Sequence, residues 1–324
     1  MGFISFDGYF GMARQSTKGT GVAPTTFVRY QTAKIIEENI IKEFREGGYD
    51  REGFFMEKVG YNVSAELESF LRADLAGLLF TMVLGSDVVS GSSTPYTHTI
   101  TPSDLQWWSI ETSELGDTLV RRLIDCKGSQ LEISGKAEDF ITIKLIALGL
   151  NVDASVSAAT ASYGSESIFK FSQGSFTTMG GVNEEINEFS LKLNNNVDLY
   201  RTGLTARQLK EKGLDVELSF SFKTTQDDEY RKVYYGGASG TSPSETMENG
   251  QVVLTFNNGL SGEDEREVKI TIPEVRYSAL EMGGLSADGD LVTYAATAKA
   301  TKNGSNHLIT VEVKNAEANA YDGS

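Results

Sequence analysis

The chain has 324 residues, 40% of them hydrophobic and only five of them proline, which is long enough for two ordinary globular domains. A formal charge of −16 argues against a protein that binds nucleic acid by neutralising phosphates, and no apolar run approaches the ~20 residues that a membrane helix requires. The single cysteine, Cys126, excludes a disulfide framework and a cysteine zinc cluster, and suits assembly in a reducing cytoplasm.

The first 24 residues are rich in Gly, Ser and Thr, with scattered aromatic residues that include Phe3 and Phe6. No period of two or of 3.6 residues dominates this stretch. It predicts an extended N-terminal arm over residues 1–24.

Residues 25–153 predict a first module, built from strands and one helix. A strand begins near Phe27, a charged connector turns at Gly47 and Gly48, and residues 53–68 alternate as a second strand. The helix follows at once and ends at Gly85. Its apolar residues recur at spacings of three and four and include Phe70, Leu71, Leu75, Leu78, Leu79 and Met82.

Four strand-like segments follow the helix. Residues 94–102 and 106–114 each predict one strand, and Trp107 and Trp108 stand at the start of the second with one ring expected to be buried. Residues 117–136 predict a hairpin that turns at Cys126, Lys127 and Gly128, and residues 140–153 predict one more strand. One helix on a mostly antiparallel sheet is therefore the expected unit.

A second module is expected over residues 168–324, after an Ala/Ser-rich linker or exposed hairpin at 154–167. Residues 189–229 repeat the order strand, charged connector, glycine turn and strand seen in residues 27–69. A shorter, more polar helix at 227–235 follows, and we match the segments 251–259, 266–284 and 291–301 to 96–102, the predicted hairpin and the last strand. The match is one of pattern order, and any two antiparallel domains share part of this rhythm.

The residues that catalysis or metal binding requires are sparse. His98 lies in a strand-like alternation and His307 beside a turn, so both are expected to be structural. Residues 287–290, Ala-Asp-Gly-Asp, lack the alternating ligands of a calcium loop and predict a hairpin turn. No phosphate loop or dinucleotide fingerprint is present. We therefore expect no enzyme, no catalytic residue, no cofactor and no metal.

The chain resembles the major tail tube proteins of long-tailed, siphophage-like bacteriophages. The resemblance rests on the acidic strand–helix junction at 64–68, the helix closed by Leu84, Gly85 and Ser86, the Gly/Ser/Thr loop followed by residues 95–100, and the glycine-bearing segment 126–131. It implies a mainly β (α+β) fold of two tandem modules, each a β-sandwich or half-barrel with one packed helix.

The same resemblance implies a structural virion protein, assembled in the host cytoplasm, that forms stacked rings around an acidic channel for double-stranded DNA. Two modules per chain suggest a threefold ring with pseudo-sixfold character, with a homohexamer as the other possibility. Tape measure, tail tip and tail terminator proteins are the further partners that it implies, and no membrane is.

Subunit contacts are expected from the helix and from the edge strands of the sheets, and axial contacts from the arm and from the loops at 154–167 and 236–250. The candidate contact residues are Phe70, Leu71, Leu75, Leu78, Leu79, Met82, Trp107, Trp108, Phe3 and Phe6.

Two other classes of function remain open at this point. A carbohydrate-binding or adhesive β-protein would use Trp107, Trp108 and the tyrosines as stacking platforms. A β-sandwich glycosidase would use paired carboxylates such as those at 184–185 or 227–228, although adjacent acids are expected by chance in a chain with 45 Asp and Glu.

Overall fold

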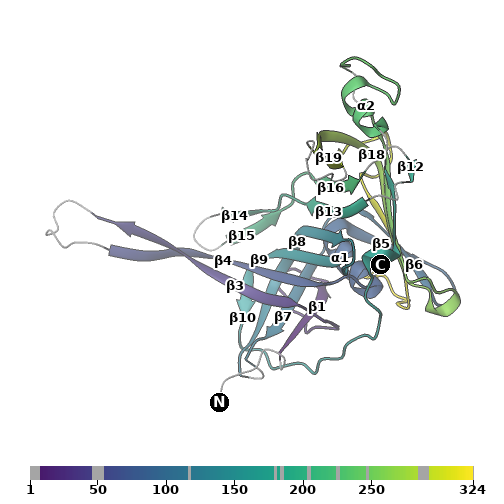
Figure 1. Cartoon of the computed structure of the whole chain (residues 1–324). Coiled ribbons are helices and arrows are strands. Elements are labelled where there is room, and N and C mark those ends of the chain that lie inside the picture. The colour runs from purple at the N-terminus through teal and green to yellow at the C-terminus, as the bar shows by residue number, and fades with distance from the viewer. Residues whose placement is uncertain are drawn as a thin grey trace.

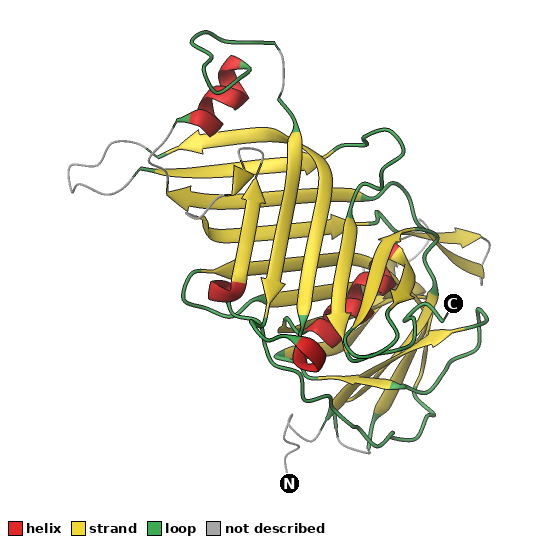
Figure 2. Ribbon diagram, turned by 90° about the vertical axis from the view of Figure 1, so that its right-hand side faces the viewer, coloured by secondary structure: helices red, strands yellow, loops and turns green. Residues whose placement is uncertain are grey.

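The computed structural model describes residues 8–45, 55–115, 118–178, 181–182, 186–202, 206–223, 227–245, 248–283 and 292–323. These residues form a mainly β protein with two α-helices, α1 (Ala73–Leu84) and α2 (Asp228–Tyr235), and two short 3-10 helices, Phe171–Gln173 and Gly262–Asp264 (Figure 2). The strands before residue 154 are β1 (Tyr9–Gln15), β2 (Thr26–Val28), β3 (Thr32–Phe44), β4 (Phe55–Phe70), β5 (Gly85–Ser90), β6 (Tyr96–Pro102), β7 (Trp107–Ser113), β8 (Val120–Lys136), β9 (Thr142–Gly149) and β10 (Asn151–Asp153). Those after it are β11 (Gly174–Thr178), β12 (Gly181–Val182), β13 (Ile186–Asn194), β14 (Asp198–Thr202), β15 (Ala206–Lys210), β16 (Asp215–Lys223), β17 (Gly250–Asn257), β18 (Glu267–Met282), β19 (Thr293–Ala300) and β20 (Thr310–Asn315). The expected mainly β class with helices is confirmed.

Apart from β14 and β15, which form a separate two-stranded sheet, the strands pair antiparallel in three continuous arrays (Figure 1). The N-sheet has the order β2-β1-β7-β8-β10. The long sheet has the order β3-β4-β9-β8-β13-β16-β19-β18. The C-sheet has the order β12-β11-β17-β18-β20-β6-β5. Because β8 and β18 each belong to two arrays, the three sheets are covalently continuous.

Strand β8 passes from the N-sheet to the long sheet without turning back, so the predicted hairpin at Cys126, Lys127 and Gly128 is wrong. The change of direction is made by Asp125, whose φ is 58°, and by a β-bulge at Ser129. Residues 266–284, matched to that hairpin, likewise contain one long strand, β18, with a bulge at Ser278. The last predicted strand of the first module divides into β9 and β10 at Leu150. There the chain passes from the long sheet back to the N-sheet, the reverse of the path that β8 takes.

The two halves of the chain repeat one topology. The order of elements predicted from the sequence captured only part of this repeat. Nine elements of the first half recur in the second half in the same order and with the same strand pairings. Strands β1 to β4 correspond to β11, β12, β13 and β16, and α1 corresponds to α2. Strands β7 to β10 correspond to β17, β18, β19 and β20. The β5–β6 hairpin occurs in the first half and the β14–β15 hairpin in the second. The counterpart of β17 is therefore β7, and not the strand at 96–102 that we expected.

The predicted extended arm is wrong where the structure describes it. Residues 9–15 form β1, which lies between β2 and β7, and the side chains of Phe10 and Met12 are fully buried. Strand β1 is the counterpart of β11, so the first module starts near residue 9 rather than 25. Residues 154–167 contain an isolated bridge between Phe27 and Tyr163 and otherwise no strand, as a linker would.

One hydrophobic core runs through both halves, and α1 lies within it. Every residue of α1 except Asp74 is buried, and the helix packs against β8 of the long sheet and against β6 and β20 of the C-sheet. Helix α2, in contrast, has no buried residue. Within the ranges described above, neither helix is long and apolar enough to cross a lipid bilayer.

Gly128 sets the distance between α1 and the long sheet. A Cβ atom at this position would lie 2.7 Å from Val83 Cγ2 and 2.9 Å from the Met82 carbonyl oxygen, and the backbone there cannot yield cheaply. We predict that Gly128→Ala lowers the free energy of unfolding by about 1–3 kcal/mol, as overpacking does. Gly213→Ala is the matched control, since a Cβ there meets no atom within 4 Å. Urea unfolding measures both, and equal midpoints for the two variants would contradict this account.

Candidate assembly surface

The joint between the two halves is a strand pair, β8 with β13. Its register places Leu191 opposite Ile133 and Leu193 opposite Leu131, and all four side chains are fully buried. This pair continues one half's sheet into the other half's sheet by main-chain hydrogen bonds.

The two halves can be matched residue by residue across the long sheet. One row of paired residues runs Ile35, Ala65, Ala147 and Gly128. The corresponding row runs Leu191, Leu218, Ala298 and Tyr277. Gly128 and Tyr277 each precede the bulge serine of their strand, which fixes the correspondence. Ile35 of β3 therefore takes the place of Leu191, and Met282 of β18 takes the place of Ile133.

The outermost strands of the long sheet are β3 and the last part of β18. Among the described residues, β3 pairs with β4 alone, and residues 276–282 of β18 pair with β19 alone. Met282 is 53% exposed, whereas its counterpart Ile133, which has β13 beside it, is fully buried. Among the described residues no further strand lies beside Met282, so its apolar side chain on the core face of the sheet edge stays exposed.

Side chains of the same chain bond to backbone groups at both edges. The Ile35 N–H donates to the Glu114 carboxylate at 3.3 Å, which shows that this group points away from β4. At the other edge the Tyr234 hydroxyl donates to the Leu280 carbonyl at 2.8 Å. Backbone donors of β3 and acceptors of β18 are thus directed outward, where a further strand would pair.

The exposed face of the long sheet carries a row of charges of alternating sign. The paired residues of six adjacent strands in this row are Glu68, Lys144, Glu132, Lys192, Glu217 and Lys299. In this register each inner Lys stands between two glutamates, and Lys299 forms an ion pair with Glu217 at 3.6 Å. The row continues to Arg276 of β18, which lies opposite Lys299 and pairs with Glu274 at 3.4 Å. The six residues from Glu68 to Lys299 are therefore balanced in charge, and the two neighbouring cations at the β18 end, Lys299 and Arg276, each have a carboxylate partner.

The β3–β4 hairpin extends well beyond the sheets (Figure 1). Its projecting part carries apolar side chains that are 36–55% exposed, namely Ile41, Phe44, Phe55, Met56 and Val59. The β14–β15 hairpin stands at the same place in the second half, between β13 and β16, and Arg201 anchors it to the Tyr61 carbonyl at 3.0 Å. Exposed apolar residues grouped on a projecting ribbon are typical of a contact surface.

The predicted contact residues lie mainly inside the chain. Leu71, Leu75, Leu78, Leu79 and Met82 are covered by the chain's own sheets, and Trp108 is buried. Phe70 is half-buried beside Phe140, and Trp107 is half-buried beside the cluster of Leu105, Leu150, Val197 and Leu209. Phe3 and Phe6 lie outside the described residues. Their role in contacts between subunits stays a prediction, while the sheet edges, which we also expected to join subunits, are the surfaces left uncovered.

Trp107 does not offer a bare stacking platform. Lys127 Nζ lies 4.5 Å and Lys18 Nζ 5.2 Å from the centroid of its indole ring, and Trp108 is 1% exposed. Nothing in this arrangement favours the carbohydrate-binding alternative over an internal role for both rings.

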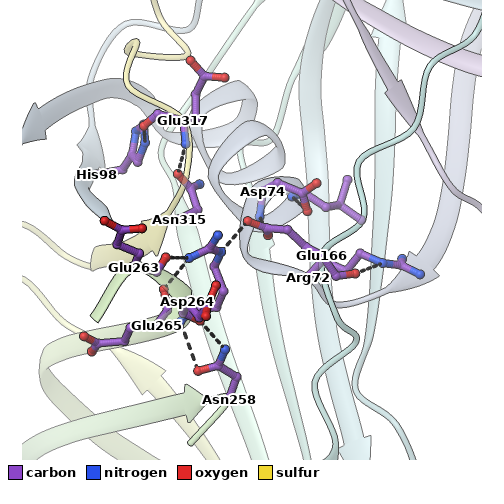
Figure 3. A network of polar contacts seen from close by, with 12 residues as sticks. Arg72, Asp74, His98, Glu166, Asn258, Glu263, Asp264, Glu265, Asn315 and Glu317 are labelled. Carbon is purple, nitrogen blue, oxygen red and sulfur yellow. Dashed lines mark hydrogen bonds and ion pairs between the residues drawn. The ribbon is translucent and has the colours of Figure 1, made fainter. Parts of the chain in front are cut away.

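A polar network ties the linker to α1 (Figure 3). The Glu166 carboxylate accepts from the Asp74 N–H at 2.8 Å, at the N-terminus of α1, and from Arg266 at 2.7 Å. Arg72 donates to the Glu166 carbonyl at 3.2 Å. Burial, followed by the charge of Asp74, raises the pKa of Glu166. The network borders a cavity of about 450 Å³, and its groups already satisfy one another in holding the linker in place.

A buried His98–Asp87 pair fastens residues 316–323 to the same region. His98 Nδ1 lies 2.8 Å from Asp87 Oδ2, and its Nε2 lies 3.0 Å from the Glu317 carbonyl. The Tyr321 N–H donates to Asp87 at 2.9 Å. The expectation of a packed, structural histidine agrees with this arrangement. The part of the chain that the structure describes contains no cluster of three or more His, Cys, Asp or Glu that could hold a metal.

Comparison with known proteins places the chain in one family. A family model described as phage tail tube protein matches residues 5–264, which is most of the chain. A search of curated proteins gave no match.

The pH dependence of stability tests the His98 arrangement. Burial alone would disfavour the charged ring, but the hydrogen bond and charge of Asp87 outweigh it and raise the pKa of His98. Stability from the charged ring is thus fully present below the ordinary histidine pKa and is lost as pH rises through the raised one. We predict that the stability gap between wild type and His98→Gln is widest at about pH 6 and narrows by about pH 8.5. Urea unfolding at several pH values measures it, and a gap independent of pH would contradict the charged pair.

Proposed function

The chain belongs to the phage tail tube protein family, and from this premise we propose that copies of it join head to tail into closed rings, which stack into a hollow tube for genome passage. The single observation that carries the proposal is the β8–β13 joint, whose two counterparts, the edge of β18 and the edge of β3, lie uncovered at opposite ends of the same sheet. Within one chain these two ends cannot meet, but they can meet between neighbours.

The joint inside the chain serves as a template for the joint between chains. With its register carried over, Ile35 of one copy lies opposite Met282 of the next, as Leu191 lies opposite Ile133. The contact would bury Met282 and pair the outward backbone groups of both edges. Glu114 and Tyr234 would release those groups when the strands pair.

Helix α2 supports the same arrangement. Helix α1 is buried because it is covered by strands of the following half, β20 and β18, as well as by its own. In the ring, the half that follows α2 would be the first half of the next copy. The N-sheet of that copy would therefore cover α2. The tyrosines of α2, Tyr230, Tyr234 and Tyr235, are the side chains available for that contact.

A head-to-tail contact between identical subunits must close into a ring or continue as a filament. We propose that three chains supply the six modules of a pseudo-sixfold ring. A ring of six chains is the second possibility, and the mass of the closed ring decides between them.

The exposed face of the long sheet would line the channel. We expected an acidic wall, but the row from Glu68 to Lys299 on this face contains three glutamates and three lysines, so the wall proposed here is charge-balanced along this row and not acidic. In this row each lysine stands opposite one or two glutamates, and Arg276 pairs with Glu274, so a DNA phosphate would compete with a carboxylate for each of these cations. A hydrated, charge-paired wall would let DNA slide, and the negative charge of the chain, −16, arises outside the row.

Axial contacts between rings are proposed for the β3–β4 hairpin, with the loops at 154–167 and 236–250 as further contributors. The hairpin projects beyond the sheets and carries the exposed apolar group described above. Tape measure, tail tip and tail terminator proteins are proposed to meet the ends or the lumen of the tube, in a tail assembled in the host cytoplasm.

A disulfide between chains tests the ring joint. Ile36 and Glu281 are the counterparts of Lys192 and Glu132, which face each other across the internal joint. We predict that Ile36→Cys with Glu281→Cys forms covalent multimers on oxidation, because directly opposite residues bring their Cβ atoms within about 5.5 Å. Non-reducing electrophoresis after assembly measures them. Native Cys126 is fully buried and should not compete.

Two variants make that test interpretable. Lys192→Cys with Glu132→Cys should close within one chain, which shows that the chemistry works in this register. Adding Met282→Lys to the Ile36/Glu281 pair should abolish the multimers, because a charge would be buried at the joint. Failure of the pair to cross-link, while the internal pair closes, would overturn the proposed joint.

The hairpin contact predicts a different defect. Ile41→Ser with Met56→Ser removes exposed apolar surface that we assign to ring stacking, so rings should persist while tubes shorten or disappear. Negative-stain electron microscopy measures tube length. Val88→Ser is the control, because Val88 is 61% exposed but lies on β5, away from the hairpin. Tubes of wild-type length in the double variant would contradict the axial role.

A further inference from the structure

One asparagine adds three hydrogen bonds at the end of the internal joint. Asn195, which follows β13, is only 5% exposed, and its amide Nδ2 donates to the Gly128 carbonyl at 2.8 Å and to the Val83 carbonyl at 2.7 Å. Its backbone N–H donates to the carbonyl of the bulge residue, Ser129, at 2.9 Å. Two of these bonds tie the end of β13 to the bulge of β8 and the third ties it to α1, and a slip of the register would break all of them.

The edge strand β3 carries an asparagine at the matching position. Asn195 lies four residues after Leu191, and Asn39 lies four residues after Ile35, the counterpart of Leu191. Asn39 is exposed in the single chain. The bulge that it would meet in a neighbouring copy is also present, since Ser278 repeats Ser129 and Tyr277 repeats Gly128.

We propose that Asn39 is the residue that sets the register of the joint between chains, an inference that rests on the ring proposed above. In this contact the Asn39 amide of one copy donates to the Tyr277 carbonyl of the next, and the Asn39 N–H donates to the Ser278 carbonyl. The partner is a second copy of this chain. The site exists only when β3 and β18 pair in the template register.

The third bond of Asn195, to the helix, is not carried over. Gly128 lets α1 approach β8 closely, because any Cβ there would meet Met82 and Val83. A buried tyrosine, Tyr277, stands at the corresponding place, so we infer that α2 cannot approach β18 as closely as α1 approaches β8. The contact of Asn39 is therefore to the strand and its bulge alone.

The test compares Asn39→Ala with Glu38→Ala, both in the Ile36→Cys, Glu281→Cys background. Glu38 is the neighbouring residue, and its side chain points to the opposite face of β3. We expect Asn39→Ala to lower the yield of cross-linked multimers about tenfold, because a buried carbonyl loses its donor, and Glu38→Ala to leave the yield unchanged. Both side chains are exposed in the free chain, so thermal unfolding of the unassembled protein should not differ between them.

The outcomes separate this inference from the proposed function. Full cross-linking by Asn39→Ala, together with loss of cross-linking by Met282→Lys, would overturn the role of Asn39 and leave the joint intact. Full cross-linking by both variants would overturn the joint and with it the inference. Equal loss in Asn39→Ala and Glu38→Ala would also contradict a role specific to the amide.

Discussion

The requirement that backbone N–H and C=O groups be paired governs this structure. A β-sheet satisfies every strand except the two at its ends, and the long sheet of this chain ends in β3 and in the last part of β18. Single side chains, Glu114 and Tyr234, occupy one backbone group at each end. The rest of the architecture positions these two ends: β8 and β18 bend so that each half contributes to the same sheet, and the β8–β13 pair shows how one half continues into another.

The repeat is close in topology but unequal in packing, and the inequality has a physical source. In the first half a glycine, Gly128, faces the helix, so α1 sits against the sheet and is buried. In the second half Tyr277 stands there, and α2 lies at the surface with no buried residue. A ring made from such halves would alternate between two kinds of module joint, one inside each chain and one between chains. The internal joint is present in every chain, whereas the proposed joint between chains would form only on assembly.

Sequence patterns predicted the strands and helices with strong local signals and missed features fixed by distant contacts. The alternation in β4, the apolar periodicity of α1 and the polar α2 each lie in one segment, so their existence could be predicted. The segment around Cys126, Lys127 and Gly128 has turn-forming composition, but the strand bends at Asp125, whose φ is positive. Asp125 is hydrogen-bonded to Gln15, more than a hundred residues away, so the bend depends on a contact that the local sequence does not show. Residues 9–15 are poor in pattern because both faces of β1 are covered, which leaves no alternation to detect. The helix residues chosen as contacts are apolar because they form the core, and the edge residue Met282 gave no signal in sequence. Asn39 could have been found only by matching the two halves in register.

Hydrogen exchange at the backbone of β3 tests the central claim most directly. The Glu37 N–H lies two residues after Ile35 and so points to the same uncovered side of the strand. If edges of neighbouring chains pair, the exchange of this amide, measured by mass spectrometry or NMR in assembled and unassembled protein, slows strongly on assembly. Exchange of the Glu37 amide at the same rate in both states would contradict the account.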